Sequence, residues 1–316
     1  MAKILAISGG VGGAKLALGL AQLLRPGELT VCANTADDFT HLGLRICPDL
    51  DTVMYTLAGL SDRARGWGLA GESWQFMAQL RTLGGEDWFQ LGDRDLAVHV
   101  LRSQWLAQGL PLVEVTRRLC QGLGVAHALV PMTEQAVTTM VDTAEGELAF
   151  QHYFVRRRCE PAVRSLRFAG IDAAQPLPLL LRLLRDPALD AVLICPSNPF
   201  VSVAPVLALP GLRQALLDSA AVVVAVSPIV GGAALKGPAA KMMAELQLPV
   251  TAAEVARYYG PLLDGFVVDE CDRAQASWVA DSGTRCLVTG TVMTTADDKV
   301  RLAREILAFV QDLAQK

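Results

Sequence analysis

The feature that most constrains the fold is a short apolar run near the N-terminus that enters a glycine-rich turn. Residues 3–7 are followed by the turn S-G-G-V-G-G, and leucines then recur at helical spacing over residues 14–24. A second apolar run covers residues 29–33. Strand, glycine turn, helix and strand in this order predict the start of a parallel β-sheet.

Later segments extend this pattern. Runs rich in Val, Leu or Ile predict further buried strands at residues 191–195, 221–226, 265–268 and 285–288. Helical segments are predicted between several of them, at residues 177–184, 211–217, 238–246 and 252–259. Strands that are apolar on both faces need helices on both sides of the sheet. The sequence therefore predicts an α/β fold with a mostly parallel sheet.

One stretch departs from the alternation of strands and helices. Residues 136–142 and 147–154, joined by a turn at 143–146 that ends in glycine, predict a small appended β-hairpin. We see no repeat and no linker that would separate two domains. We therefore expect a single domain over residues 1–316, with a small β/α insertion around residues 130–165.

Composition excludes several classes of protein. The 28 Lys and Arg residues against 32 Asp and Glu give a net charge of −4, without the basic surplus that sequence-independent nucleic-acid binding needs. Mean hydropathy is +0.35, but the longest uncharged run, residues 191–212, contains four prolines and could not cross a membrane as a helix. Seven scattered cysteines without C-x-x-C spacing suit reduced thiols, so we expect a cytoplasmic protein.

The glycine turn is a candidate phosphate site. Glycines let a phosphate approach backbone N–H groups, and a helix N-terminus adds positive potential. The pattern G-x-x-x-x-G-K-[ST] fails because Ala14 precedes Lys15 and Leu16 follows it. The pattern G-x-G-x-x-G fails because Lys15 stands where the third glycine belongs. A plain turn into a helix is the alternative explanation.

Aspartates gather after the second predicted strand. Asp37 and Asp38 follow it closely, and Asp49 and Asp51 come shortly before a helix expected to begin near Thr52. On an extended segment, two residues spaced by two face the same way. Carboxylates at such an edge suit Mg²⁺ beside a diphosphate. The alternative is that one aspartate caps the helix and another is merely solvated.

Three further groups follow predicted strands or precede helices. Arg94 stands between Asp93 and Asp95 before an amphipathic helix, which Asp95 could cap. Its guanidinium could join an ion network or bind a phosphate oxygen. Turns at 195–199 and 226–232 follow predicted strands, where ligands of α/β sheets bind. Their polar side chains are Ser197, Asn198 and Ser227, for which helix capping is the alternative.

Taken together, these motifs resemble one family, the 2-phospho-lactate transferases of deazaflavin coenzyme F420 biosynthesis. The resemblance runs in order from residue 3 to about residue 295. Its motifs are S-G-G-V-G-G-A-K-L (8–16), N-T-A-D-D (34–38), C-P-D-L-D-T-V-M-Y (47–55), L-G-D-R-D-L-A (91–97), P-S-N-P (196–199), S-P-I-V-G-G (227–232) and K-G-P-A-A-K-M-M (236–243). It implies a Rossmann-like three-layer αβα fold, a need for Mg²⁺ and a homodimer.

The resemblance also implies a reaction. The donor is a guanosine diphosphate ester of a three-carbon acid, either lactyl or enolpyruvyl, and the acceptor is a ribityl hydroxyl of the deazaflavin Fo. GMP leaves, and the product is coenzyme F420-0 or dehydro-F420-0. The family's Fo contacts fall around Asp51 and the stretch before Arg94, where Gln90 is placed to face the ring. The sequence does not decide which three-carbon acid is carried.

These arguments give a set of expected site residues. Catalytic residues are Asp37, Asp51 and Arg94; metal ligands are Asp37, Asp49 and Asp51; Fo contacts are Asp51, Gln90 and Arg94; and nucleotide or phosphate contacts are Ser8, Gly9, Gly10, Gly12, Gly13, Lys15, Asn34, Ser197, Asn198 and Ser227. One alternative is a guanine-nucleotide-binding regulatory protein on the same scaffold. An NAD-dependent dehydrogenase is disfavoured, because Asn34 and Thr35 stand where a ribose-binding acid would be expected.

Overall fold

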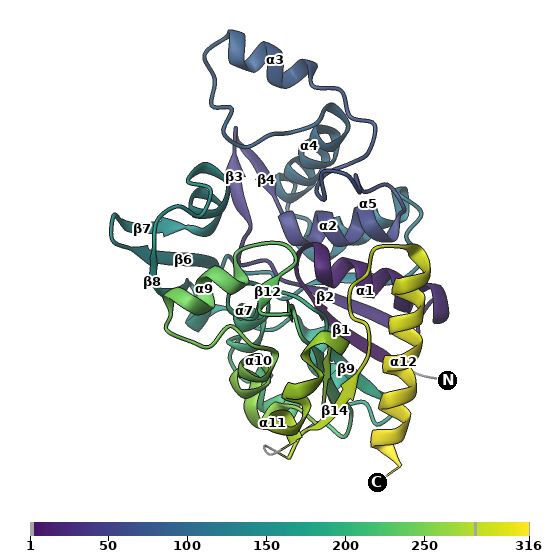
Figure 1. Cartoon of the computed structure of the whole chain (residues 1–316). Helices are drawn as coiled ribbons and strands as arrows, with labels where there is room; N and C mark the ends of the chain where they lie inside the picture. The colour runs from purple at the N-terminus through teal and green to yellow at the C-terminus, as the bar shows by residue number, and fades with distance from the viewer. Residues whose placement is uncertain (1–2, 281–282, 316) are drawn as a thin grey trace.

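The computed structural model, which describes residues 3–280 and 283–315, is built on a seven-stranded parallel sheet (Figure 1). Its strand order is β14-β13-β10-β9-β1-β2-β5. The strands are β1 (Ile4–Ser8), β2 (Leu29–Ala33), β5 (Ala128–Pro131), β9 (Ala191–Ile194), β10 (Val222–Val226), β13 (Gly265–Val268) and β14 (Arg285–Val288). The predicted parallel sheet is confirmed, and β5 is a strand that the sequence reading missed.

Helices cover both faces of this sheet, because successive residues of each strand point to opposite sides. In β1, Ile4 and Ala6 join one hydrophobic core, and Leu5 and Ile7 join the other. The first core is closed by α1 (Gly10–Leu23), α2 (Pro48–Leu57), α5 (Leu112–Gly122) and α12 (Ala296–Ala314). The second is closed by α6 (Pro178–Leu184), α8 (Leu212–Leu217), α9 (Ala239–Glu245) and α10 (Ala252–Tyr259). The expected three-layer αβα arrangement is confirmed.

The strand order reverses between β1 and β9. From β1 the chain proceeds outward to β2 and β5, and it returns at β9 to build β10, β13 and β14 on the other side. Ligands of open parallel sheets bind beyond the carboxyl ends of the strands at such a reversal. The turn after Ser8 and the turn after Ile194 therefore flank the expected ligand crevice.

In the part of the chain that the structure describes, three small antiparallel elements accompany the sheet, and the smallest is the two-stranded pair of β11 (Ile229–Val230) and β12 (Ala233–Ala234). Another is a three-stranded sheet of β6 (Thr138–Thr143), β7 (Gly146–Ala149) and β8 (Val163–Ala169), in the order β7-β6-β8. The predicted hairpin is confirmed, although residues 152–156 form a π-helical turn instead of continuing the strand, and β8 was not predicted. A further element is the hairpin of β3 (Phe39–His41) and β4 (Leu44–Ile46), also not predicted. The single-domain assignment stays a prediction.

The remaining elements are short, apart from α4. They are α3 (Gln75–Thr82), α4 (Asp93–Ala107), α7 (Ala204–Leu207) and α11 (Ala276–Ala280). Figure 1 shows α3 standing away from the body of the molecule, beyond β3 and β4. No helix in residues 3–280 and 283–315 is both long and apolar enough to cross a bilayer.

Candidate active site

The turns after β1 and β9 are joined directly by hydrogen bonds. Gly9 N donates to Ser197 Oγ over 3.0 Å, and Ser197 Oγ donates to the Gly9 carbonyl over 2.7 Å. A Cβ added at Gly12 would lie 2.3 Å from the Pro196 carbonyl oxygen, and one at Gly13 would lie 2.4 Å from Ser8 Oγ. Close packing of the two turns thus accounts for Gly12 and Gly13 as glycines, and phosphate contact at them stays a prediction.

Asp49 occupies the N-terminal end of α1. Gly10, at a φ of +60°, donates its N–H to Asp49 Oδ1 over 2.6 Å. Asn34 Nδ2 donates to Asp49 Oδ2 over 3.0 Å and to the Val201 carbonyl over 3.2 Å, while its Oδ1 accepts the Ala36 N–H. The buried carboxylate is therefore held between the end of β2 and the start of α1, at the strand reversal.

Asp37 lies close enough to Asp49 for their charges to interact. Burial, and then the Asp49 carboxylate, raise the pKa of Asp37 well above its usual value. Burial also raises the pKa of Asp49 to about 6, against the hydrogen bonds from Asn34 and Gly10 that lower it. Among the described residues Asp37 Oδ1 has no hydrogen-bond partner. Two buried acids with an unpartnered oxygen form a site where positive charge would be favourable.

Two carboxylates are too few to hold a metal through protein atoms alone, but they are enough for Mg²⁺. Mg²⁺ commonly takes one or two carboxylates and completes its shell with waters and substrate phosphates. Across residues 3–280 and 283–315, no three or more His, Cys, Asp or Glu side chains gather as ligands for one ion. Asp37 and Asp49 are therefore the two predicted metal ligands that the structure brings together.

Asp51 lies elsewhere. Residues 48–57 are helical and not extended, so positions 49 and 51 are about 200° apart around the helix axis. The prediction that Asp49 and Asp51 face the same way is wrong for this reason. Asp51 Oδ1 contacts Arg102 Nη2, and Oδ2 accepts Arg102 Nη1 over 3.1 Å. Arg102 is 1% exposed, which makes this a buried ion pair.

The Asp51–Arg102 pair belongs to a network between α2 and α4. Tyr55 donates its hydroxyl to Asp95, which lies 3.2 Å from His99 Nε2. Asp95, His99 and Arg102 are spaced by four and three residues, so they share one face of α4. Arg102 was missed by the sequence reading, although this polar stripe at helical spacing was the available signal. Asp95 was expected to cap α4, and that prediction is wrong.

Arg94 is held by a backbone carbonyl and not by its acidic neighbours. Its Nη1 donates to the Ala70 carbonyl over 2.6 Å. Asp93 accepts the N–H groups of Gln75 and Phe76 and so caps α3. The alternative in which Arg94 joins an ion network with Asp93 and Asp95 is therefore wrong. The side chain is exposed, and its Nε and Nη2 bond to nothing in the described chain, so a role in the reaction stays a prediction.

An aromatic cluster lies just before Gln90. Its rings are Phe39 and His41 of β3 together with Trp88 and Phe89, with centroids 5.0 Å apart for His41–Trp88 and 4.9 Å for Phe39–Phe89. Trp88 Nε1 and His41 Nε2 are buried, and neither has a partner in the described residues. Gln90 Nε2 donates to the Asp87 carbonyl over 2.6 Å and so shapes this loop.

The other predicted phosphate contacts have local partners. Ser227 Oγ donates to the Ile229 carbonyl over 2.8 Å, and Asn198 Oδ1 accepts the Phe200 N–H over 2.9 Å. Asn198 caps the helical turn that follows it, as the capping alternative predicts, whereas Ser227 shapes a turn that leads into β11 and caps no helix. Lys15 Nζ donates to the Met293 carbonyl over 2.8 Å. Ser8 Oγ is buried and unpartnered within the described chain.

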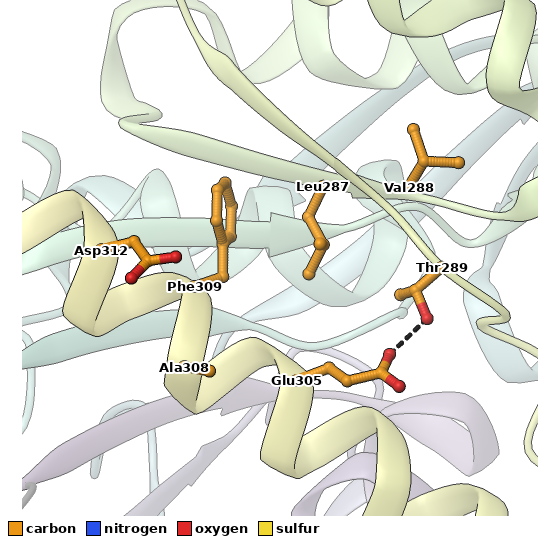
Figure 2. A pocket seen from close by; sticks show the side chains of 7 residues that line it. All are labelled: Leu287, Val288, Thr289, Glu305, Ala308, Phe309 and Asp312. Carbon is orange, nitrogen blue, oxygen red and sulfur yellow. Dashed lines mark hydrogen bonds between the residues drawn. The ribbon is translucent and has the colours of Figure 1, made fainter.

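A hollow of about 380 Å³ lies apart from these residues, between β14 and α12 (Figure 2). Its polar lining residues are Thr289, Glu305 and Asp312, and the first two hydrogen-bond to each other. Leu287 and Phe309 supply apolar surface. None of the predicted site residues lines this hollow, and the candidate site remains the acid pair at the strand reversal.

Known proteins resemble the chain over almost its whole length. The family model "2-phospho-L-lactate transferase CofD" matches residues 4–305. A phosphoenolpyruvate transferase of Streptomyces coelicolor is 39% identical over 99% of each chain. A 2-phospho-L-lactate transferase of Methanosarcina mazei is 38% identical over 95% of this chain and 98% of its own.

The fold is also found among solved structures. A UPF0052 family protein of Bacillus halodurans shares it with a TM-score of 0.64 over 97% of this chain and 98% of that chain. At 15% identity this likeness concerns the fold alone. The family is instead shown by the match over residues 4–305 and by relatives near 40% identity. The chain therefore belongs to the CofD family of 2-phospho-L-lactate transferases.

Proposed function

We propose that this protein transfers a phospho-acid group from a guanosine diphosphate ester of a three-carbon acid to a ribityl hydroxyl of Fo, with release of GMP. The observation that carries the proposal is the buried pair of Asp37 and Asp49 at the strand reversal, beside the N-terminus of α1. Displacement at a diphosphate depends mainly on alignment and on neutralisation of charge. A site that favours positive charge at this edge suits such a reaction.

Asp37 and Asp49 would hold Mg²⁺ in this proposal. The ion would offset the negative charge that develops on the diphosphate as GMP leaves. The chain's own part is to keep the carboxylates in place. Gly10 and Asn34 fix Asp49 by two hydrogen bonds, and Ser197 fixes the backbone of Gly9 beside it. Little rearrangement of these groups is then needed when substrate binds.

The acceptor is proposed to bind near the aromatic cluster. A planar deazaflavin ring buries apolar surface and has polar edges, so it needs aromatic contacts and a few donors. Phe39, His41, Trp88 and Phe89 supply the rings, and Trp88 Nε1 is an unused donor among the described residues. Only the Nη1 group of the Arg94 guanidinium donates a hydrogen bond within the described chain, to the Ala70 carbonyl. Its other N–H groups could bind a polar group of the acceptor or the phosphate. Asp51 is not placed there, because Arg102 engages both of its oxygens.

The experiment is an incubation of purified protein with Fo, Mg²⁺ and the lactyl or enolpyruvyl guanosine diphosphate ester. The products are identified by mass spectrometry. We expect GMP and F420-0 or dehydro-F420-0, and loss of both when EDTA removes Mg²⁺. The two names carried by the relatives differ in the three-carbon acid, so both donors are compared at equal concentration. Binding of GDP without transfer from either donor would favour the regulatory alternative.

A further inference from the structure

The hairpin of β3 and β4 connects the two parts of the candidate site. Asp37 of the acid pair lies two residues before Phe39, where β3 begins. Phe39 and His41 of this hairpin supply two rings of the aromatic cluster. Two residues of chain span at most about 7 Å. A shift of the hairpin would therefore move the rings relative to the acid pair.

The apolar residues of the hairpin belong to a core of their own. Ile46 is buried together with Met77 and Leu91, and Phe39 and Leu44 pack against this group. The group is separate from the two hydrophobic cores that flank the seven-stranded sheet. Polar contacts therefore have a large part in fixing the hairpin against the rest of the molecule.

Arg45 of β4 makes polar contacts in two directions. Its backbone N–H donates to Ser103 Oγ over 2.8 Å, and its carbonyl accepts a hydrogen bond from Arg102 Nη1 over 3.4 Å. Both partners lie on α4, beside which β4 runs (Figure 1). Its side chain reaches back to the start of the hairpin, where Nη2 donates to Asp38 Oδ2 over 3.2 Å. One residue thus ties the hairpin both to α4 and to the neighbour of Asp37.

The ion pair of Arg45 and Asp38 is shielded from water. The Asp38 side chain is 0% exposed and the Arg45 side chain 28% exposed. In residues 3–280 and 283–315, Arg45 is the only side chain that forms a salt bridge with Asp38. Charges attract each other more strongly where water and salt screen them less. This contact is therefore suited to hold the two segments in a fixed relation.

We propose that Arg45 is a positioning residue for the transfer reaction, and that its ion pair with Asp38 holds the aromatic cluster in place relative to Asp37 and Asp49. The proposal rests on the proposed function, in which the acceptor ring binds at this cluster. In the transfer, the ribityl oxygen forms a bond to the phosphorus that bears the three-carbon acid. The bond from that phosphorus to the bridging oxygen breaks, GMP leaves, and the hydroxyl proton passes to water. Arg45 touches neither substrate, and it acts on the alignment of the attacking oxygen.

Steady-state kinetics of three variants, normalised to folded protein, test the proposal. Arg45→Met removes the charge, and Arg45→Lys keeps a charge that can still pair with Asp38; both leave the backbone contacts to α4 in place. The matched control is Arg167→Met, which removes the ion pair with Glu147 in the other small sheet.

We expect the kcat of Arg45→Met to fall about tenfold or more, because a misplacement of about 1 Å can lower a rate by about 100-fold. The KM values for Fo and for the donor should stay within about threefold of those of the unchanged protein. Arg45→Lys should recover most of the rate, and Arg167→Met should match the unchanged protein.

A double variant separates alignment from stability. Arg45→Met leaves the Asp38 carboxylate buried without a counter-charge, so its Tm should fall. Arg45→Met combined with Asp38→Asn removes both charges and should recover most of the Tm, while its kcat should stay low. Asp38→Asn alone keeps an amide oxygen that can accept from Arg45, so it should be faster than the double variant. A return of kcat together with Tm in the double variant would make Arg45 purely structural and overturn the proposal.

This proposal and the proposed function fail in different ways. A protein that transfers nothing to Fo from either donor would overturn the proposed function, and this role with it. Transfer by the unchanged protein, with the kcat of Arg45→Met within twofold of it, would overturn this role alone. A higher KM for Fo at unchanged kcat would overturn it too, because Arg45 would then act on binding of the acceptor and not on its alignment.

Discussion

Asp49 and Asp51 are two residues apart in the first turn of one helix, yet their surroundings differ completely. Asp49 faces α1, next to Asp37, where burial raises its pKa to about 6 and its partners are neutral N–H groups. Asp51 faces α4, where Arg102 neutralises it through two contacts. An acid that is buried without a counter-charge is a candidate for ligand chemistry, whereas a paired acid holds the structure together. By this criterion Asp49 belongs to the candidate site, and Asp51 belongs to the structure that surrounds it.

The largest effect on stability is expected at Asp51. Asp51→Asn should lower the free energy of unfolding by about 3–5 kcal/mol, because it leaves the Arg102 guanidinium buried without its charged partner. Urea unfolding followed by circular dichroism measures this change. The paired variant Asp51→Leu with Arg102→Met should recover most of the loss, because it removes both charges together. Unfolding of Asp51→Asn at the same urea concentration as the unchanged protein would contradict the comparison.

Asp49→Asn should lower the rate of transfer much more than it lowers the stability of the fold. The amide keeps the shape of the side chain and relieves the repulsion with Asp37, but its NH2 group cannot accept one of the two N–H groups that Asp49 binds. We therefore expect the free energy of unfolding to fall by about 1–3 kcal/mol, less than for Asp51→Asn. Loss of the negative charge should lower the rate of transfer to Fo at least ~100-fold, about 2.7 kcal/mol of activation free energy. The exposed Asp312→Asn serves as a control. Full activity of Asp49→Asn would move the catalytic site away from this pair.

The smallest expected effect comes from the same Arg→Lys change at two places. Arg94→Lys keeps a charge but loses the planar fork at an exposed position, so we expect about a tenfold lower kcat, roughly 1.4 kcal/mol, with Tm unchanged. Arg102→Lys should lower Tm instead, because one ammonium cannot replace two guanidinium contacts to Asp51. Single-turnover kinetics normalised to folded protein separates these outcomes. Lowered Tm with an unchanged rate in Arg94→Lys would make that residue structural.

Much of the candidate site could be predicted from the sequence, because loops at the carboxyl ends of parallel strands must meet. The turn after β1 and the turn after β9 do so, through Gly9 and Ser197. The error over Asp51 came from the local conformation. Asp49 and Asp51 were read as extended, whereas Pro48 starts the helix and turns them to different sides.

The layered architecture follows from local patterns in the sequence alone. Runs such as residues 191–194 and 265–268 are apolar on both faces, and this local pattern specifies buried parallel strands wherever the rest of the chain lies. Which charged side chains meet depends on the packing of elements far apart in the sequence. Arg102 reaches Asp51 from another helix, and Lys15 reaches Met293 from a loop 278 residues away in sequence. Such pairings depend on how helices and loops pack across the sheet. The period of a hydrophobic pattern predicts only which face of a helix is buried, and it does not predict which element that face contacts.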